Sequence, residues 1–133
     1  MMPLIKKLSE PKTLAFIGVA YTLFTTTILL MPGSEIPQIK IAFIDKITHV
    51  FIHVFLSFIW LAYAFSWDKY PVSVKKVSVV LLACFSYGIV IEVVQLLFIP
   101  TRSYDAFDII ANGFGSVIGL LIYWVFRNTL SNA

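Results

Sequence analysis

Charge is scarce in this chain of 133 residues, because only 13% of them are Asp, Glu, Lys or Arg. Average soluble domains have about 25% charged and about 45–50% apolar residues. Here 59% of the residues are apolar, and the mean hydropathy is +0.91. A domain this small has too much surface to bury so many apolar side chains in water. The composition therefore argues against a soluble enzyme, a disordered chain and a fibrous repeat.

Cysteine is almost absent as well. Cys84 is the only one and lies in an apolar run, so no disulfide can form within the chain and zinc-finger spacings are missing. The net charge of +3 is small, and the basic residues are scattered, which argues against nucleic acid as a partner. These absences leave a membrane protein as the expected class, with the lipid bilayer as its main partner.

Four long apolar runs alternate with short polar joints. A bilayer core requires about 20 apolar residues per helix. We expect transmembrane helices at about residues 13–31, 47–67, 77–99 and 109–126. No joint is long enough for a separate soluble domain. The prediction is therefore an all-α fold, in which residues 1–133 form a single membrane domain of four transmembrane helices.

The basic residues are distributed unequally between the two sides of this bundle. Lysine and arginine accumulate on the cytoplasmic side of membrane proteins. Both termini are therefore expected in the cytoplasm, on the side that carries more of them. That side holds seven basic residues, Lys6, Lys7, Lys12, Lys69, Lys75, Lys76 and Arg127, and the other side holds three, Lys40, Lys46 and Arg102.

Polar side chains interrupt the apolar runs at helical spacing. A charged group near the bilayer centre costs roughly 3 kcal/mol or more, so it usually faces protein or water and has a function. Asp45, His49 and His53 step by four residues, which places them on one helix face. The stripes of the two later helices are Gly88, Glu92, Gln95 and Ile99, and Asp108, Asn112, Gly115 and Gly119.

The three stripes start from the same membrane surface. At 1.5 Å per residue, His53 lies about 12 Å beyond Asp45, and Glu92 lies about 12 Å before Pro100. We therefore predict that the stripes meet in a polar pocket in the outer half of the membrane, with residues 100–105 over its mouth. The candidate ligand-binding residues are Asp45, Lys46, His49, His53, Glu92, Gln95, Arg102, Asp105, Asp108 and Asn112.

In the leading interpretation, this pocket binds an amphiphilic or lipid-linked ligand of the cell envelope. Arg102 would hold an anionic head group, while Glu92 and His49 would tune or exchange protons. His49 and His53 have the histidine spacing of the H-E-x-x-H zinc motif, but Val50 stands where that motif has glutamate. We therefore expect neither a metal nor a cofactor.

Other interpretations stay open. The protein could be a membrane-embedded hydrolase or transferase, with Glu92 and His49 as acid and base and Asp105 or Asp108 as metal ligands. It could instead be a structural subunit whose GxxxG pair, Gly115 and Gly119, packs against a helix of a membrane partner or of a second copy. The polar set could also be an internal ion-pair network that fixes the helix register.

The same residues resemble the signature of a known family. Residues 45–49 read D-K-I-T-H and resemble the D-K-x-x-H opening of the VanZ-like family, and residues 92–95 resemble its E-x-x-Q signature. Residues 100–119 resemble its tail, P-x-R-x-x-D-x-x-D-x-x-x-N-x-x-G-x-x-x-G. The resemblance covers about residues 45–126, and His53 stands where many members have tyrosine.

This resemblance implies a small multi-pass protein of the bacterial inner membrane. The name-giving member is associated with low-level resistance to the glycopeptide teicoplanin, so a link to glycopeptide resistance is implied too. The resemblance also implies a shared polar set, which comprises Asp45, Lys46, His49, Glu92, Gln95, Arg102, Asp105, Asp108 and Asn112.

Overall fold

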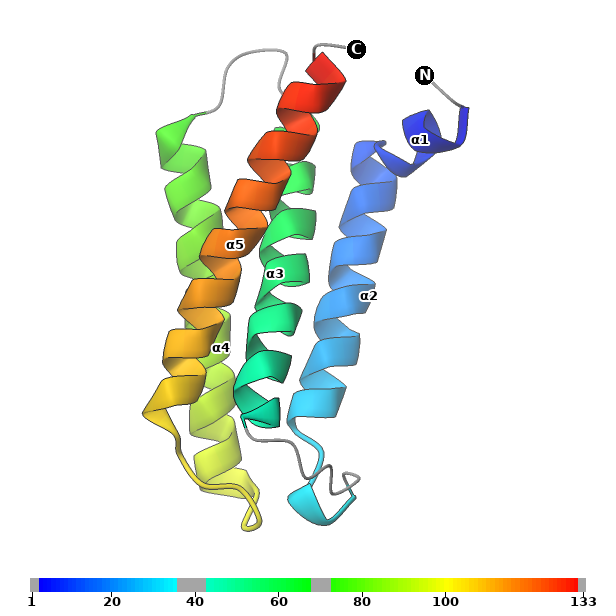
Figure 1. Cartoon of the computed structure of the whole chain (residues 1–133). Helices are drawn as coiled ribbons and strands as arrows, with labels where there is room; N and C mark the ends of the chain where they lie inside the picture. Colours follow the sequence, from blue (N-terminus) through cyan, green and yellow to red (C-terminus); the bar gives the residue numbers. More distant parts are fainter. Residues whose placement is uncertain (1–2, 36–42, 68–72, 132–133) are drawn as a thin grey trace.

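The computed structural model describes residues 3–35, 43–67 and 73–131, and these residues form helices but no strand (Figure 1). Four of the helices are long and apolar enough to cross a membrane, which confirms this part of the prediction. The elements are α1 (Pro3–Leu8), α2 (Pro11–Leu29), the short 3-10 helix η1 (Gly33–Glu35), α3 (Ile44–Phe65), α4 (Val74–Phe98) and α5 (Ala106–Ser131).

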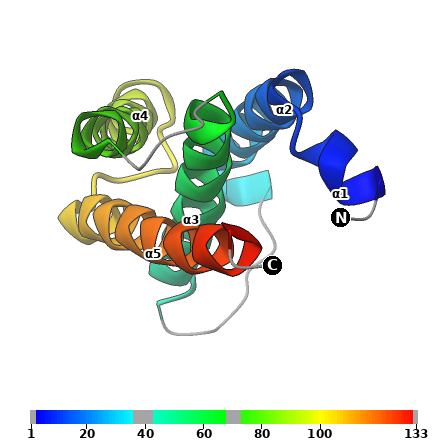
Figure 2. The ribbon, with the colours of Figure 1, turned by 90° about the horizontal axis from the view of Figure 1, so that it is seen from above.

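The four long helices run side by side in alternating directions, with α1 and the last turns of α5 at one end (Figure 1). The opposite end is formed by η1, the start of α3, the connection between α4 and α5, and the start of α5. We call it the pocket end. Viewed along the bundle, α3 lies between the other three long helices (Figure 2). Its contact with α5 is the most extensive in the molecule.

Helices α3 and α5 each begin three residues before the expected position, because both extend through a charged first turn. Asp45 lies in the first turn of α3, where a carboxylate is favoured by the helix dipole. At α5, the Asp105 carboxylate accepts the backbone N–H of Phe107 at 2.9 Å and so caps the helix. A prediction from hydropathy places the starts of α3 and α5 too late, because it assigns the charged first-turn residues to the polar segments between the helices.

Two glycines allow α5 to approach α3 closely. A Cβ atom added at Gly115 would collide with the backbone carbonyl oxygen of Val50. One added at Gly119 would collide with the Val54 carbonyl oxygen and with the Ser57 hydroxyl. The small residues of a GxxxG pair therefore bring the two backbones together within this chain, as they do in many membrane helix pairs.

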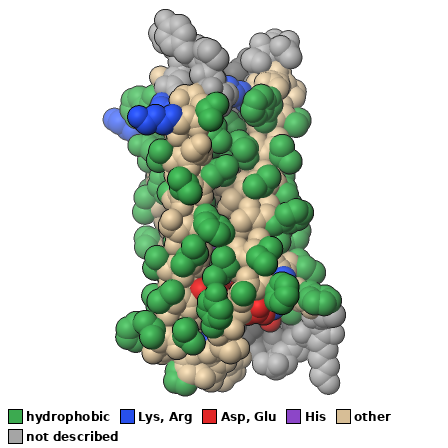
Figure 3. All heavy atoms as spheres, turned by 90° about the vertical axis from the view of Figure 1, so that its left-hand side faces the viewer, with side chains coloured by type: hydrophobic (Ala, Val, Ile, Leu, Met, Phe, Trp, Pro, Cys, Tyr) green, Lys and Arg blue, Asp and Glu red, His purple; other side chains and the backbone are tan. Residues whose placement is uncertain are grey.

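The surface is apolar where a soluble protein would be polar. Phe16 and Phe98 are 75% and 74% exposed, whereas Glu92 is 1% exposed. Hydrophobic side chains are spread along the whole face drawn in Figure 3, with Lys and Arg prominent near its upper end and Asp and Glu toward its lower end. This arrangement suits a bundle surrounded by lipid, with its polar groups turned inward.

The described basic residues keep the unequal distribution on which the orientation was predicted. Lys46 and Arg102 lie at the pocket end, whereas Lys40 and Lys69 lie outside the described residues. The end that holds α1 also holds Lys6, Lys7, Lys12, Lys75, Lys76 and Arg127. That both termini face the cytoplasm stays a prediction.

Candidate functional site

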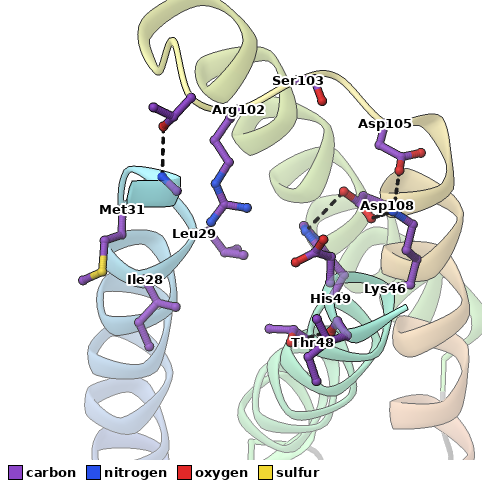
Figure 4. Close-up of a pocket in the computed structure, with 14 residues that line it drawn as sticks. Ile28, Leu29, Met31, Lys46, Thr48, His49, Arg102, Ser103, Asp105 and Asp108 are labelled. Atoms are coloured by element: carbon purple, nitrogen blue, oxygen red, sulfur yellow. Dashed lines mark hydrogen bonds and ion pairs between the residues drawn. The ribbon is translucent and has the colours of Figure 1, made fainter. Parts of the chain in front are cut away.

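A pocket of about 540 Å³ opens at the pocket end, between α2 and the start of α3 (Figure 4). Its α2 wall is apolar and includes Ile28 and Leu29. Its opposite wall is polar and includes His49 and Asp108. One cavity therefore offers an apolar and an ionic surface to the same ligand.

Arg102 projects between these two walls from the connection that joins α4 to α5 (Figure 4). Its Nε atom is buried and has no hydrogen-bond partner among the residues that the structure describes. Its backbone is held by a hydrogen bond from the Arg102 N–H to the Ile99 carbonyl oxygen at 3.0 Å. Buried donors of this kind are normally paired, so the guanidinium has an unused capacity for an anion.

Thr101 fixes the connection that carries Arg102. The hydroxyl oxygen of Thr101 accepts the backbone N–H of Gly33 at 2.9 Å, which joins the connection to η1. Both residues line the pocket, so this bond closes one side of its rim. The arginine is thus presented from a loop that is tied to the neighbouring helix end.

Lys46 joins the starts of α3 and α5. Its ammonium group donates to the Asp105 carboxylate and lies 3.4 Å from Oδ1 of Asp108. The hydrogen bond from Lys46 holds the pKa of the Asp105 carboxyl below its usual value. This ion pair forms the edge of the polar wall, above the deeper groups.

Beneath this edge lies a buried cluster that we call the triad, which consists of His49, Glu92 and Asp108. Nε2 of His49 is 3.7 Å from Oε1 of Glu92 and 3.7 Å from Oδ2 of Asp108. His49 is 3% exposed and Glu92 is 1% exposed. Both carboxylate oxygens of Glu92 lack a hydrogen-bond partner among the described residues. One side chain from each of α3, α4 and α5 thus meets the other two.

Asn112 determines which nitrogen of His49 faces the carboxylates. The amide oxygen of Asn112 lies 2.9 Å from Nδ1 of His49. Because an amide oxygen can only accept, Nδ1 carries the hydrogen in this pair. Nε2 is therefore the nitrogen that is turned toward Glu92 and Asp108, and it is available as a base or as a ligand.

His53 lies one turn deeper on α3 and is fully buried. Its Nδ1 is 3.2 Å from the carbonyl oxygen of His49, and its Nε2 has no partner among the described residues. A Cβ atom at Gly88 would lie 2.9 Å from Nε2 of His53 and 2.5 Å from Nδ2 of Asn112. The glycine therefore makes the space that these two polar side chains share.

Gln95 shares a stripe with Glu92 but has a different contact. Its Nε2 donates to the backbone carbonyl oxygen of Leu29 at 2.5 Å. Leu29 ends α2, where the last carbonyl groups have no partner within the helix. This bond attaches the end of α2 to α4 and accounts for the burial of Gln95 without a ligand.

The sequence-predicted residues thus separate into five groups. His49, Glu92, Asp108 and Asn112 meet in the buried cluster, and Lys46 and Asp105 pair at its edge. The remaining ones lie apart: Arg102 and Asp45 line the pocket, His53 lies deeper, and Gln95 contacts α2.

Sequence reasoning missed two serines that continue the same stripes. The Ser57 hydroxyl donates to the Ser116 carbonyl oxygen at 3.1 Å, in the buried contact between α3 and α5. Ser57 stands four residues after His53, and Ser116 stands four residues after Asn112. Extending each polar stripe by one more turn would have found both.

Comparison with known protein families gives a match over most of the chain. The family model described as VanZ/LLP1 matches residues 3–127, nearly the whole chain. No curated protein and no solved structure matches the chain. The match extends beyond the motif region of residues 45–126 and includes α2, which forms the apolar wall of the pocket.

Proposed function

The chain belongs to the VanZ/LLP1 family of membrane proteins, and we propose that it binds the anionic head group of an amphiphile at the surface of the bacterial inner membrane. One observation carries the proposal. The Arg102 guanidinium enters a pocket of about 540 Å³ with its Nε buried and unpaired among the described residues. An anionic group placed there would receive charge-assisted hydrogen bonds from it.

The pocket walls favour an amphiphile over a small soluble anion. Ile28 and Leu29 give the α2 wall an apolar surface, while Lys46 and Arg102 supply cations on the other side. A head group at Arg102 therefore leaves an acyl chain free to follow α2 toward the lipid. The volume is typical of pockets for small molecules, which span roughly 300–1,000 Å³.

The class of amphiphile follows from the predicted orientation. With both termini in the cytoplasm, the pocket end faces outward, where envelope components are assembled. Lipid-linked envelope components and lipoglycopeptides both combine an acyl chain with polar, acidic groups. A role in teicoplanin resistance would then come from binding such a molecule at the outer leaflet.

The test uses a soluble probe, dihexanoyl phosphatidic acid, titrated into protein purified in neutral detergent. Arg102→Gln should weaken binding about 10- to 100-fold, because a hydrogen bond to a charged group contributes roughly 1.5–3 kcal/mol. Lys75→Gln is the matched control, since it also removes one cation but lies at the far end of α4. Equal binding of the zwitterionic dihexanoyl phosphatidylcholine, or unchanged affinity in Arg102→Gln, would contradict the proposal.

The triad favours a second candidate, in which the bound amphiphile is also processed. Nε2 of His49 lies 3.7 Å from Oε1 of Glu92, and both side chains are buried. This arrangement would suit a general base and a general acid. In this membrane-embedded hydrolase or transferase, Glu92→Gln would keep probe affinity but abolish turnover. Release of inorganic phosphate from the same probe would support this candidate, and its absence in the wild-type protein would count against it.

A further inference from the structure

The buried cluster has an excess of negative charge. Together with Asp105 at its edge, it has three carboxylates, whereas the nearby cations are the ammonium group of Lys46 and the guanidinium of Arg102, whose charge acts on Glu92. Lys46 pairs with the two aspartates, which leaves Glu92 with His49 as its ion-pair partner among the described residues. With Nδ1 of His49 donating to Asn112, a neutral imidazole would direct the lone pair of Nε2 at two carboxylate oxygens. A cation placed between His49, Glu92 and Asp108 would offset this excess of negative charge.

We propose that the triad binds a divalent transition metal, with zinc as the first candidate. One ligand atom each from His49, Glu92 and Asp108 lies within 4.8 Å of the other two. Zinc binds imidazole nitrogen and carboxylate oxygen at about 2.0–2.2 Å, so ligands of one ion lie roughly 3.5 Å apart. The two 3.7 Å distances from Nε2 are close to that value, and small rotations of the carboxylates complete the site.

The surrounding groups fit a metal site. Asn112 accepts from Nδ1 of His49, as outer groups do in sites where they orient a histidine ligand. The two oxygens of Asp108 face different groups: Oδ1 lies near Lys46, whereas Oδ2 is turned toward His49. The two oxygens of Glu92 are buried and accept no hydrogen bond from the described residues, so a ligand role would satisfy them.

This inference replaces the sequence-based expectation that no metal is bound. That expectation rested on the missing glutamate between His49 and His53. In the structure only His49 reaches the carboxylates, while Nε2 of His53 faces Gly88. The ligands come from three helices, so no local motif could reveal them.

Three protein ligands leave a fourth position free. His49 and Asp108 also line the pocket, so this position faces the cavity that Arg102 enters. An oxygen of the bound head group would occupy it. This last step rests on the proposed function, whereas the binding of the metal by the three side chains does not.

The test is metal titration of detergent-purified protein that carries no polyhistidine tag and has been stripped with a chelator. Zinc should bind at about one ion per chain, and cobalt in its place should give the visible absorption of an ordered tetrahedral site. Glu92→Gln and Asp108→Asn should each weaken zinc binding at least about 100-fold, since even loss of an outer-shell group costs roughly 10- to 100-fold.

Asp45→Asn is the matched control, because Asp45 is a pocket carboxylate outside the triad. Glu92→Gln removes a buried charge and keeps the side-chain shape, so we expect this variant to fold. Asp108→Asn tests a second ligand independently. Substoichiometric zinc in the wild type, or zinc affinity in both triad variants that is unchanged from the wild type, would overturn the metal site. Absence of zinc binding by the wild-type protein, with Arg102-dependent probe binding intact, would overturn the metal site alone.

Discussion

Asp105 acts on two elements at once. One carboxylate oxygen accepts the backbone N–H of Phe107 and caps α5, and the other accepts from the ammonium group of Lys46 on α3. Both interactions favour the ionised carboxylate, and the pKa of Asp105 lies below its usual value for this reason, with the bond from Lys46 as the larger cause. The starts of α3 and α5 are therefore held together by a carboxylate that stays ionised to a lower pH than an ordinary aspartate does.

This arrangement predicts an acid-dependent loss of stability. Because the pKa of Asp105 is lower in the folded than in the unfolded chain, its contribution is complete above the unfolded pKa, about 3.9, and is lost as the pH falls through the folded pKa. Thermal unfolding in detergent should show Asp105→Asn less stable than wild type at pH 7. The difference should shrink as the pH falls below 4. A difference independent of pH would contradict this account.

At the scale of residues, the sequence could predict which side chains share a helix face, but not which groups they contact. Four-residue spacing places Asp45 and His49 on one side of a helix, whatever the fold. It cannot show that Gln95 donates to Leu29 while Glu92, three residues earlier, meets His49. That choice depends on where the end of α2 lies against α4, which is a long-range property of the packing.

At the scale of elements, the close approach of α3 and α5 depends on Gly119. A Cβ atom there would collide with the backbone of Val54, which cannot move aside as a flexible side chain can. Gly119→Ala should therefore destabilise the protein by about 1–3 kcal/mol, the usual cost of overpacking. The measurement is the unfolding midpoint in mixed detergent.

Gly113→Ala is the control for that experiment, because the glycine lies on the same helix. Its added Cβ would lie 3.3 Å from the ring of Phe85, a side chain that can shift. Alanine also has the higher helix propensity, so the Gly113 variant should be at least as stable as the wild type. Equal losses of stability in the two variants would show that the close approach of α3 and α5 does not depend on Gly119.

The four long helices were predictable from the sequence because each is an apolar run long enough for a bilayer. The shorter elements were not. α1 has six residues, too few to show a helical period. η1 is joined through Gly33 to Thr101, which is 68 positions away in the chain. Contacts of this kind appear only once the helices are packed.

At the scale of the whole molecule, the orientation in the membrane decides which molecules reach the pocket. The unequal distribution of basic residues predicts that the pocket end faces outward. In a Cys84→Ser background, Ser103→Cys should react with a membrane-impermeant maleimide in intact cells. Lys75→Cys should react only after permeabilisation, and both positions are exposed. The opposite labelling pattern would contradict the orientation.

The most direct test of the central claim, that the pocket end holds an amphiphile, is photocrosslinking in native membranes. A photoreactive p-benzoylphenylalanine at Met31, which lines the pocket, is compared with one at Val79, which is exposed near the other end. Mass spectrometry should find an anionic amphiphile crosslinked to the Met31 probe, at a proportion far above its fraction of the membrane lipid. Arg102→Gln should abolish this enrichment. Bulk phospholipid on both probes, in proportion to membrane composition, would contradict the account.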